Sequence, residues 1–293
     1  MGINNSIKNY YDLSKPQIMY LLVFTAIATM IVNKGFSNSI IDLVIIAIAV
    51  GFGSAGSSAL TGYIDRDIDQ IMNRTKNRVV PTGKIKPVNS VIYGLIISSL
   101  SLIIAYIINP LCAIFMFIGI FDNVVIYSIL LKRRHSSNII LGGISGGMPV
   151  LIGYSAITTP ETSWLTAVLM SALVIIWIPA HIWSLALYFK EEYQKVNVPM
   201  LTVVTDEKLS IRYIAIASII TVIFTLALYF IGVFGIIYLI LAGIIGGIML
   251  ILNIQLLVAP TRKRAWTIFK YSSPYLYIIF MVMIIDSLIR ITI

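Results

Sequence analysis

The sequence predicts an all-α membrane protein with about nine transmembrane helices. Three observations predict this class: the composition, the mean hydropathy and the length of the apolar runs. Hydrophobic residues make up 59% of the 293-residue chain and charged residues 11%, whereas a soluble domain carries about 25% charged residues. The mean hydropathy is +0.96. Several apolar runs reach the roughly 20 residues that a helix needs to cross the hydrocarbon core, and they lack the alternation of membrane β-strands.

Nine apolar runs follow one another along the chain, and each is predicted to form one helix. Their approximate ranges are 17–33, 40–62, 88–108, 111–131, 138–157, 163–189, 211–231, 234–258 and 273–292. Helices are expected because a lone strand would leave its backbone polar groups unsatisfied in lipid. We predict that residues 1–293 form a single membrane domain.

The basic residues predict the orientation of the helices. All of the 21 Lys and Arg residues except Lys34, Arg212 and Arg290 lie in the N-terminal segment or in alternate loops, on one predicted side of the membrane. Because cytoplasmic loops carry the excess of Lys and Arg, we expect the N-terminus in the cytoplasm. The net charge of +9 then suits anionic lipid or an anionic substrate, and no nucleic acid is needed to explain it.

Similar charged loops recur four spans apart. An acidic cluster follows the second span and another follows the sixth, and the separation of Asp65 from Glu192 nearly equals that of Lys132 from Arg262. We therefore predict two related four-helix halves, roughly 14–135 and 136–264, with the ninth helix added. Repeats of this kind place a site at the interface between the halves. The alternative is a coincidence produced by the charge bias alone.

The stretch DRDID (65–69) places carboxylates at helical spacing. Asp65 and Asp69 are four residues apart and share one face of a helix, whereas Asp67 points about 200° away. Two such carboxylates repel each other, and a divalent cation relieves the repulsion. Magnesium is typically held by one or two carboxylates together with substrate phosphates, and nearby Arg and Lys can neutralise the remaining charge. The stretch predicts a Mg²⁺-held diphosphate; the alternative is a solvated loop.

A second set of candidate residues lies in and after the sixth span. Glu191 and Glu192 are expected to present the same acidic chemistry from the other half. His181 lies two residues after Pro179, which is expected to break the helical ladder. If the helix nevertheless continues, His181 lies about 16 Å deeper than Glu192 on the same face. We expect His181 to ligate a haem iron, to act as a base, or to hydrogen-bond a neighbouring helix.

Four stretches of the sequence carry a recognisable pattern. They are SKPQIMYLL (14–22), YIDRDIDQIMNRTKNRVVPTGKIKP (63–87), YSILLKRRHSSNIILGGISGGMPVLIGYSA (127–156) and WIPAHIWSLALYFKEEYQKVNVPMLTVV (177–204). Together they resemble the UbiA-type intramembrane prenyltransferases, and the last two resemble the branch of that family that acts on haem. With the nine spans, the resemblance covers nearly the whole chain. Thr61, His135, Ala180 and Asn197 depart from the family pattern, and none of these departures removes a charged group.

The resemblance implies a prenyltransferase of the cell membrane whose active site faces the cytoplasm. Its implied substrates are farnesyl diphosphate, held through Mg²⁺, and haem b. Loss of diphosphate would leave an allylic carbocation, which a haem vinyl group attacks before water completes the product. The residues and the resemblance together predict catalytic roles for Asp65, Asp69, Lys132 and Glu192. Of these, Asp65, Asp69 and Glu192 are the predicted metal ligands. The predicted substrate-binding residues are Arg66, Arg78, Lys84, Arg133, His181, Lys190 and Glu191.

Two alternatives to this function stay open at the level of sequence. Within the same family, the acceptor is instead a quinone precursor or a glycerol phosphate lipid, although the His181-Ile182-Trp183 stretch favours haem. From another class, the chain is a secondary transporter. A transporter is expected to concentrate polar groups and helix breaks near the bilayer midplane, whereas here the charges gather at the predicted cytoplasmic ends of the helices.

Overall fold

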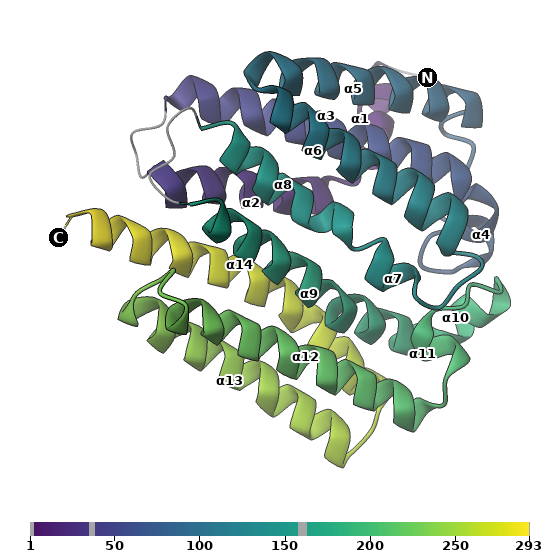
Figure 1. Ribbon diagram of the computed structural model, residues 1–293. Coiled ribbons are helices and arrows are strands. Elements are labelled where there is room, and N and C mark those ends of the chain that lie inside the picture. The colour runs from purple at the N-terminus through teal and green to yellow at the C-terminus, as the bar shows by residue number, and fades with distance from the viewer. Residues whose placement is uncertain (1–2, 35–38, 158–162, 293) are drawn as a thin grey trace.

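The computed structural model describes residues 3–34, 39–157 and 163–292. Every regular element within these ranges is a helix (Figure 1). Nine helical spans in the described residues are long and apolar enough to cross a membrane. The predicted all-α class and its nine spans are therefore confirmed.

Each span corresponds to one helix or to two consecutive helical segments. In chain order they are α2 (Pro16–Lys34), α3 (Ile40–Ile64), α5 (Pro87–Ile108), α6 (Pro110–Phe121) with η1 (Asp122–Leu131), α7 (Asn138–Leu141) with α8 (Ile144–Ser155), α9 (Trp164–Tyr188), α12 (Glu207–Phe230), α13 (Ile236–Val258) and α14 (Arg262–Thr292). A short helix, α1 (Ile3–Leu13), precedes the first span, and three more lie in the connections between spans: α4 (Arg66–Ile71), α10 (Lys190–Lys195) and α11 (Leu201–Val204).

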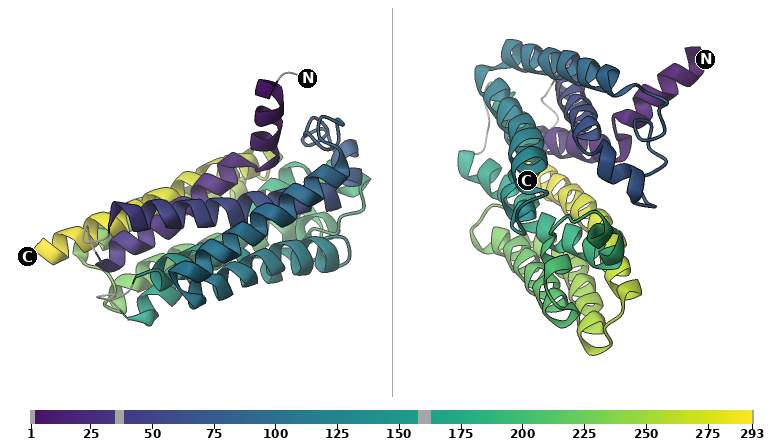
Figure 2. Two further views of the ribbon diagram at one scale, coloured as in Figure 1. Left: turned by 90° about the horizontal axis from the view of Figure 1, so that it is seen from above. Right: turned by 90° about the vertical axis from the view of Figure 1, so that its right-hand side faces the viewer.

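The long helices form a bundle in which neighbours along the chain are mostly neighbours in space. Contacts run from α2 to α3, α5, α6 and α8 in turn, then to α9, α12, α13 and α14. Helix α14 returns to contact both α9 and α2, so it joins the two predicted halves. The short helices α1, α4, α10 and α11 lie at one end of the bundle, away from the C-terminus (Figures 1 and 2). We call this the charged end; the internal repeat itself stays a prediction.

Glycines allow two of the helix pairs to approach closely. A Cβ atom added at Gly56 of α3 would lie 2.7 Å from the backbone nitrogen of Ser98 in α5. A Cβ atom at Gly153 of α8 would collide with the carbonyl oxygen of Ala26 in α2. Small residues of this kind are what lets membrane helices pack backbone against backbone. The contact at Gly153 ties α8 directly to α2.

Two spans begin earlier than the hydropathy pattern predicts. Helix α14 starts at Arg262 instead of near residue 273, and α12 starts at Glu207 instead of 211. The side chain of Asp206 caps α12 by accepting a hydrogen bond from the amide of Leu209 at 2.8 Å. Hydropathy detects the part of a helix that suits hydrocarbon, and polar turns outside that layer extend the helix without changing the pattern.

The expected geometry of the sixth span is wrong in two respects. Helix α9 continues through Pro179, because the missing hydrogen bond of a proline is tolerated in membrane helices, and it then ends at Tyr188. Glu192 lies in the separate helix α10. His181 and Glu192 therefore do not share one helical face.

The second half of the fourth span is a π-helix, which nothing in the sequence predicted. It covers Asp122–Leu131, and the amide of Lys132 closes it by donating to the carbonyl of Tyr127 at 2.7 Å. Such segments are rare and occur frequently at functional sites. Here the wider turn changes which residues after position 121 face the interior of the bundle.

Candidate active site

A cavity of about 520 Å³ lies inside the bundle, between helices of both predicted halves and α14. We call it the main cavity. Its charged residues lie at the charged end: Lys15, Asp65, Asp69, Arg74, Arg78 and Lys132. Farther from that end, the lining residues are mostly apolar. Val50 is one of them, and it lies about 22 Å from Asp65 along α3, at 1.5 Å per residue. The main cavity therefore combines a charged mouth with an interior that is mostly apolar.

Asp65 and Asp69 both line the main cavity and are buried. Helical hydrogen bonds continue through the junction of α3 and α4, from the amide of Asp65 to Thr61 and from the amide of Asp69 to Asp65. The two carboxylates consequently share a face, as their spacing predicts. Asp67 lies on the opposite, exposed side and pairs with Arg133, whose guanidinium holds the pKa of Asp67 at about 2.

Each buried aspartate has a basic partner from another part of the chain. Lys132, which follows the π-helix, places its Nζ 2.5 Å from Oδ2 of Asp65. Arg78, in the loop after α4, donates to both oxygens of Asp69 at 2.8 and 3.0 Å. Burial by itself lowers the pKa of Lys132, but Tyr127 and Asp65 more than offset it, and the net shift is upward. Lys132 is therefore a cation throughout the neutral range.

The donor set fits a magnesium ion shared with a substrate. Oδ1 of Asp65 is buried and has no hydrogen-bond partner in the protein, although a buried carboxylate oxygen is costly to leave unpaired. No group of three or more His, Cys, Asp or Glu side chains forms a metal site within the described ranges. Two carboxylates that leave the remaining positions to phosphate oxygens and water form the kind of site that Mg²⁺ uses.

Lys15 belongs to this constellation, although the sequence did not mark it as a site residue. It lies between α1 and α2 with a positive φ of 50°, lines the main cavity, and donates from Nζ to the hydroxyl of Thr61 at 3.1 Å. Burial, with Arg78 close by, lowers the pKa of Lys15 to about 8. The signal available in the sequence was its position at the start of the SKPQ motif, directly before the first span.

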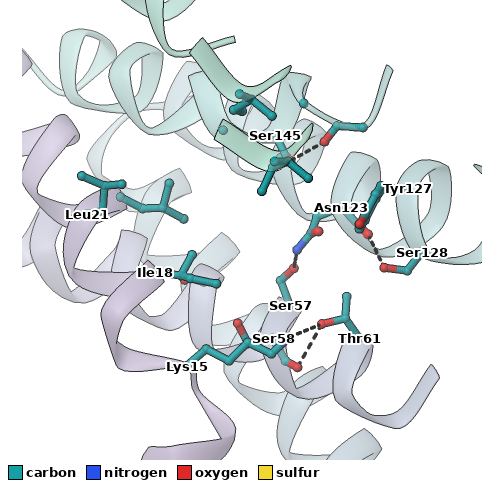
Figure 3. A pocket seen from close by; sticks show the side chains of 18 of the residues that line it. Lys15, Ile18, Leu21, Ser57, Ser58, Thr61, Asn123, Tyr127, Ser128 and Ser145 are labelled. Carbon is teal, nitrogen blue, oxygen red and sulfur yellow. Dashed lines mark hydrogen bonds between the residues drawn. The ribbon is translucent and has the colours of Figure 1, made fainter. Parts of the chain in front are cut away.

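The middle of the main cavity carries uncharged polar side chains. Asn123 of the π-helix donates to the hydroxyl of Ser57 in α3 at 2.6 Å, and Ser128 donates to the carbonyl of Asn123 at 2.9 Å. Figure 3 shows Asn123 and Ser57 meeting across the cavity, with Lys15, Ser58 and Thr61 beyond them. The π-helix thus supplies Asn123 and, at its end, Lys132 to the same cavity.

His181 lines the main cavity from α9 and is held on three sides. Its ring stacks between Trp177 and Phe269, with centroid distances of 4.4 and 4.5 Å. Nδ1 lies 2.5 Å from the hydroxyl of Ser272 in α14. Because that hydroxyl donates its own proton to the carbonyl of Phe269 at 2.8 Å, it must accept from Nδ1–H. Nε2 of the neutral ring consequently carries the free lone pair.

The remaining predicted site residues lie outside the main cavity, and their predicted roles stay predictions. Arg66 donates to the carbonyl of Tyr63, and Arg133 is bound to Asp67. Lys190 donates to the carbonyl of Thr205. None of these three basic residues lines the cavity. Lys84 lines a second, smaller cavity next to the main one.

The second acidic cluster does not reach the two aspartates. Glu191 is exposed and forms an ion pair with Arg262 at 2.7 Å. Glu192 accepts from the backbone amide of Arg74 at 3.2 Å and does not line the main cavity. The next residue, Tyr193, lines it instead. Helix α10 therefore contacts the loop after α4 at Arg74, whose amide donates to Glu192 and whose guanidinium donates to the hydroxyl of Tyr193 at 3.3 Å.

The chain resembles known proteins over nearly its whole length. It is 41% identical to protoheme IX farnesyltransferase 2 of Cenarchaeum symbiosum, with 96% of each chain covered. It is 42% identical to a protoheme IX farnesyltransferase of Thermoplasma volcanium, with 95% of this chain and 97% of that protein covered.

Solved structures share the fold at lower identity. A digeranylgeranylglyceryl phosphate synthase superposes with a TM-score of 0.80 at 21% identity, covering 97% of this chain and 99% of the other. A UbiA homologue from Archaeoglobus fulgidus bound to GPP and Mg²⁺ superposes with a TM-score of 0.64 at 16% identity, covering 94% and 99%. The model of the UbiA prenyltransferase family matches residues 21–281. The chain therefore belongs to the UbiA prenyltransferase family.

Proposed function

We propose that this enzyme transfers the farnesyl group of farnesyl diphosphate to a vinyl group of haem b. The observation that carries the proposal is the pair of buried carboxylates, Asp65 and Asp69, at the mouth of a cavity whose interior is mostly apolar. The relatives named protoheme IX farnesyltransferase support haem b as the acceptor. We also propose that the charged end faces the cytoplasm of the cell membrane, in agreement with its excess of Lys and Arg.

The charged mouth would hold the diphosphate. Asp65 and Asp69 would bind Mg²⁺, which neutralises the diphosphate and so promotes its departure. In the ligand-free protein the carboxylates are neutralised by Lys132 and Arg78. When the ion takes their place, these two cations and Lys15 are free to contact phosphate oxygens. Binding would thus replace the two ion pairs within the protein by contacts of the carboxylates with Mg²⁺ and of the basic residues with phosphate.

The apolar interior would hold the isoprenoid chain. Side chains such as Leu21, Met116 and Ile152 line this part of the main cavity. As the bond between carbon 1 and the diphosphate oxygen breaks, the electron pair leaves with the diphosphate and an allylic cation forms. An apolar wall keeps water away from that cation until the vinyl group attacks it. Water then adds to the haem side chain and loses a proton, which gives a hydroxyethylfarnesyl group.

His181 is the proposed contact for haem iron. Its Nε2 lone pair is free because Nδ1–H is bound to Ser272, and neutral imidazole is a common iron ligand. On α9, which ends at Tyr188 at the charged end, His181 lies about 10 Å inside the bundle from that residue. Haem bound there would lie within the bundle and next to the isoprenoid.

The test is product formation by the purified protein in lipid nanodiscs. Farnesyl diphosphate and Mg²⁺ are supplied with haem b, with an aromatic acid of the quinone-precursor type, or with a glycerol phosphate lipid. We expect a farnesylated haem, identified by its mass and its later chromatographic elution, and its loss when EDTA removes the metal. Product from either other acceptor, with none from haem b, would overturn the proposed acceptor and keep the enzyme class.

A further inference from the structure

A second cavity of about 310 Å³ lies beside the main cavity at the charged end, and we call it the side cavity. It lies between the N-terminal segment, the end of α3 and the loop that follows α4. The residues that line both cavities are Lys15, Ser58, Asp69, Arg74 and Arg78. The two cavities are therefore adjacent, and the wall that they share includes the Asp69–Arg78 ion pair.

The loop that forms the outer wall of the side cavity has a fixed fold. Gly83 has a φ of +73°, which favours glycine, and the amide of Ile85 donates to the carbonyl of Val79 at 3.0 Å. Ile85 and Val79 are both buried in a small apolar cluster with the ends of α1 and α3. Lys84 is consequently held between an ordered turn and a buried residue.

Positive charge prevails in the side cavity. Its basic residues are Lys15, Arg74, Arg78 and Lys84, and its acidic residues are Asp12 and Asp69. Asp69 is already neutralised by Arg78. Within the described part of the chain, Lys84 forms no ion pair. Four basic residues against two acidic ones give the lining of the side cavity a net positive charge, which attracts an anion.

The size of the side cavity limits which anion it can hold. Its volume equals roughly ten water molecules at about 30 Å³ each, which suits an inorganic diphosphate with part of its hydration shell. The long apolar chain of farnesyl diphosphate requires the main cavity. Prenyl transfer must also return a polyanion to water, and this requires a polar route at the charged end because the interior of the main cavity is mostly apolar.

We infer that the side cavity is the exit site for inorganic diphosphate. The leaving group passes from the main cavity between Lys15 and Arg78 and binds to Lys84 before release. The inference rests on the proposed function, because it takes diphosphate as the leaving group. It also gives Lys84 a more specific role than the substrate binding that the sequence predicted.

Direct binding of inorganic diphosphate to the full chain in nanodiscs tests this site without prenyl substrate or haem. Lys84→Gln is expected to weaken binding about fivefold, the upper range for an exposed charge pair, and Lys84→Arg is expected to restore it. Lys76→Gln is the matched control, because Lys76 lies in the same loop, binds Asn73 at 2.8 Å and lines neither cavity. Equal affinities of Lys84→Gln and Lys76→Gln would overturn the inference.

Steady-state kinetics separate product from substrate. Lys84→Gln should raise the inhibition constant of inorganic diphosphate by a larger factor than the KM of farnesyl diphosphate. If the inhibition constant and the KM rose by equal factors, Lys84 would contact the substrate as much as the product, and the exit site would be overturned. The binding experiment needs no turnover, so a protein that binds diphosphate through Lys84 but farnesylates no haem would refute the proposed acceptor alone. A protein that farnesylates haem with Lys84 unused would refute the exit site alone.

Discussion

The two acidic clusters lie at the same end of the bundle and differ mainly in burial. The carboxylate side chains of Asp65 and Asp69 are 5% and 4% exposed, whereas that of Glu191 is 68% exposed. The ion-pair distances are alike, at 2.5 and 2.8 Å against 2.7 Å. An exposed ion pair contributes about 0–1 kcal/mol to the free energy of unfolding, whereas removing one partner of a buried pair lowers that free energy by about 3–5 kcal/mol. Burial beside a cavity, and not the charge pattern, distinguishes the proposed ligand site from a surface ion pair.

The strongest test of this comparison removes the buried acids. Asp65→Asn combined with Asp69→Asn should lower prenyl transfer by more than about 1,000-fold, because both proposed metal ligands lose their charge. Asp67→Asn is the matched control from the same segment, and its exposed position predicts a change within about threefold. Rates are compared by product mass spectrometry, and folding by gel filtration and thermal unfolding. A folded double variant with normal turnover would remove the carboxylates from the mechanism.

The next largest effect is expected from the cation that faces Asp65. Lys132→Gln should lower the rate about 100-fold, which is the usual cost of removing one charge-stabilising group. Arg134→Gln removes the same charge two residues away at an exposed position and should change the rate less than about threefold. Single-turnover rates at saturating farnesyl diphosphate measure the difference. Similar losses in both variants would mean that the general positive potential matters, and not the contact with Asp65.

Lys15 predicts a pH dependence of substrate binding. Its pKa is lowered to about 8, so it is charged below that pH and loses its charge above it. The charged groups that face it are Asp65, Asp69, Arg78 and Lys132, and the pKa of Lys132 is raised. The KM of farnesyl diphosphate should therefore rise about tenfold between pH 7 and pH 9.

Lys15→Arg separates this effect from a general loss of activity at high pH. Arginine stays charged throughout this range, so the variant should show a KM that is nearly independent of pH. The last ionisation of a phosphate group has a pKa near 6, so it is about nine-tenths complete at pH 7 and adds little to the change. An equal rise of KM in the arginine variant would assign the pH dependence to another group.

A smaller effect is expected for the residue that orients His181. Ser272→Ala removes the acceptor of Nδ1–H and should weaken haem binding about fivefold, the usual worth of one hydrogen bond. Ser272→Thr keeps the hydroxyl and should restore the affinity. Titration of the haem absorption band measures both the affinity and the ligation state. An unchanged spectrum and affinity in Ser272→Ala would leave His181 as a packing residue of the cavity wall.

The sequence could predict what depends on local spacing, and it missed what depends on tertiary contact. The nine spans and the common face of Asp65 and Asp69 follow from hydropathy and from the helical period, and the structure confirms both. The partners of the acids do not follow from spacing. Lys132 and Arg133 are adjacent in the sequence, yet the first binds Asp65 inside the cavity and the second binds Asp67 outside it.

The same limit explains the other differences. The π-helix decides which residues before Lys132 face the cavity, and no residue pattern signalled it. Lys15 reaches the site because α1 and α2 meet at a sharp corner, where its φ is positive. Glu192 was expected to mirror Asp65 through the repeat, but α9 ends at Tyr188 and α10 carries Glu192 elsewhere. Equivalent positions in the two predicted halves can carry the same charge, as Asp65 and Glu192 do, while their side chains point in different directions.

The smallest predicted effect tests the exposed cluster itself. Glu191→Gln should change the KM of farnesyl diphosphate by less than about twofold, because its ion pair with Arg262 is exposed. Substrate binding by Glu191, the role expected from the sequence, predicts a much larger change in KM. Arg262→Gln breaks the same pair from the other side and should behave alike. If Glu191→Gln alone raised KM more than tenfold, α10 would have to close over the cavity during turnover, and burial in the ligand-free protein would no longer separate the two clusters.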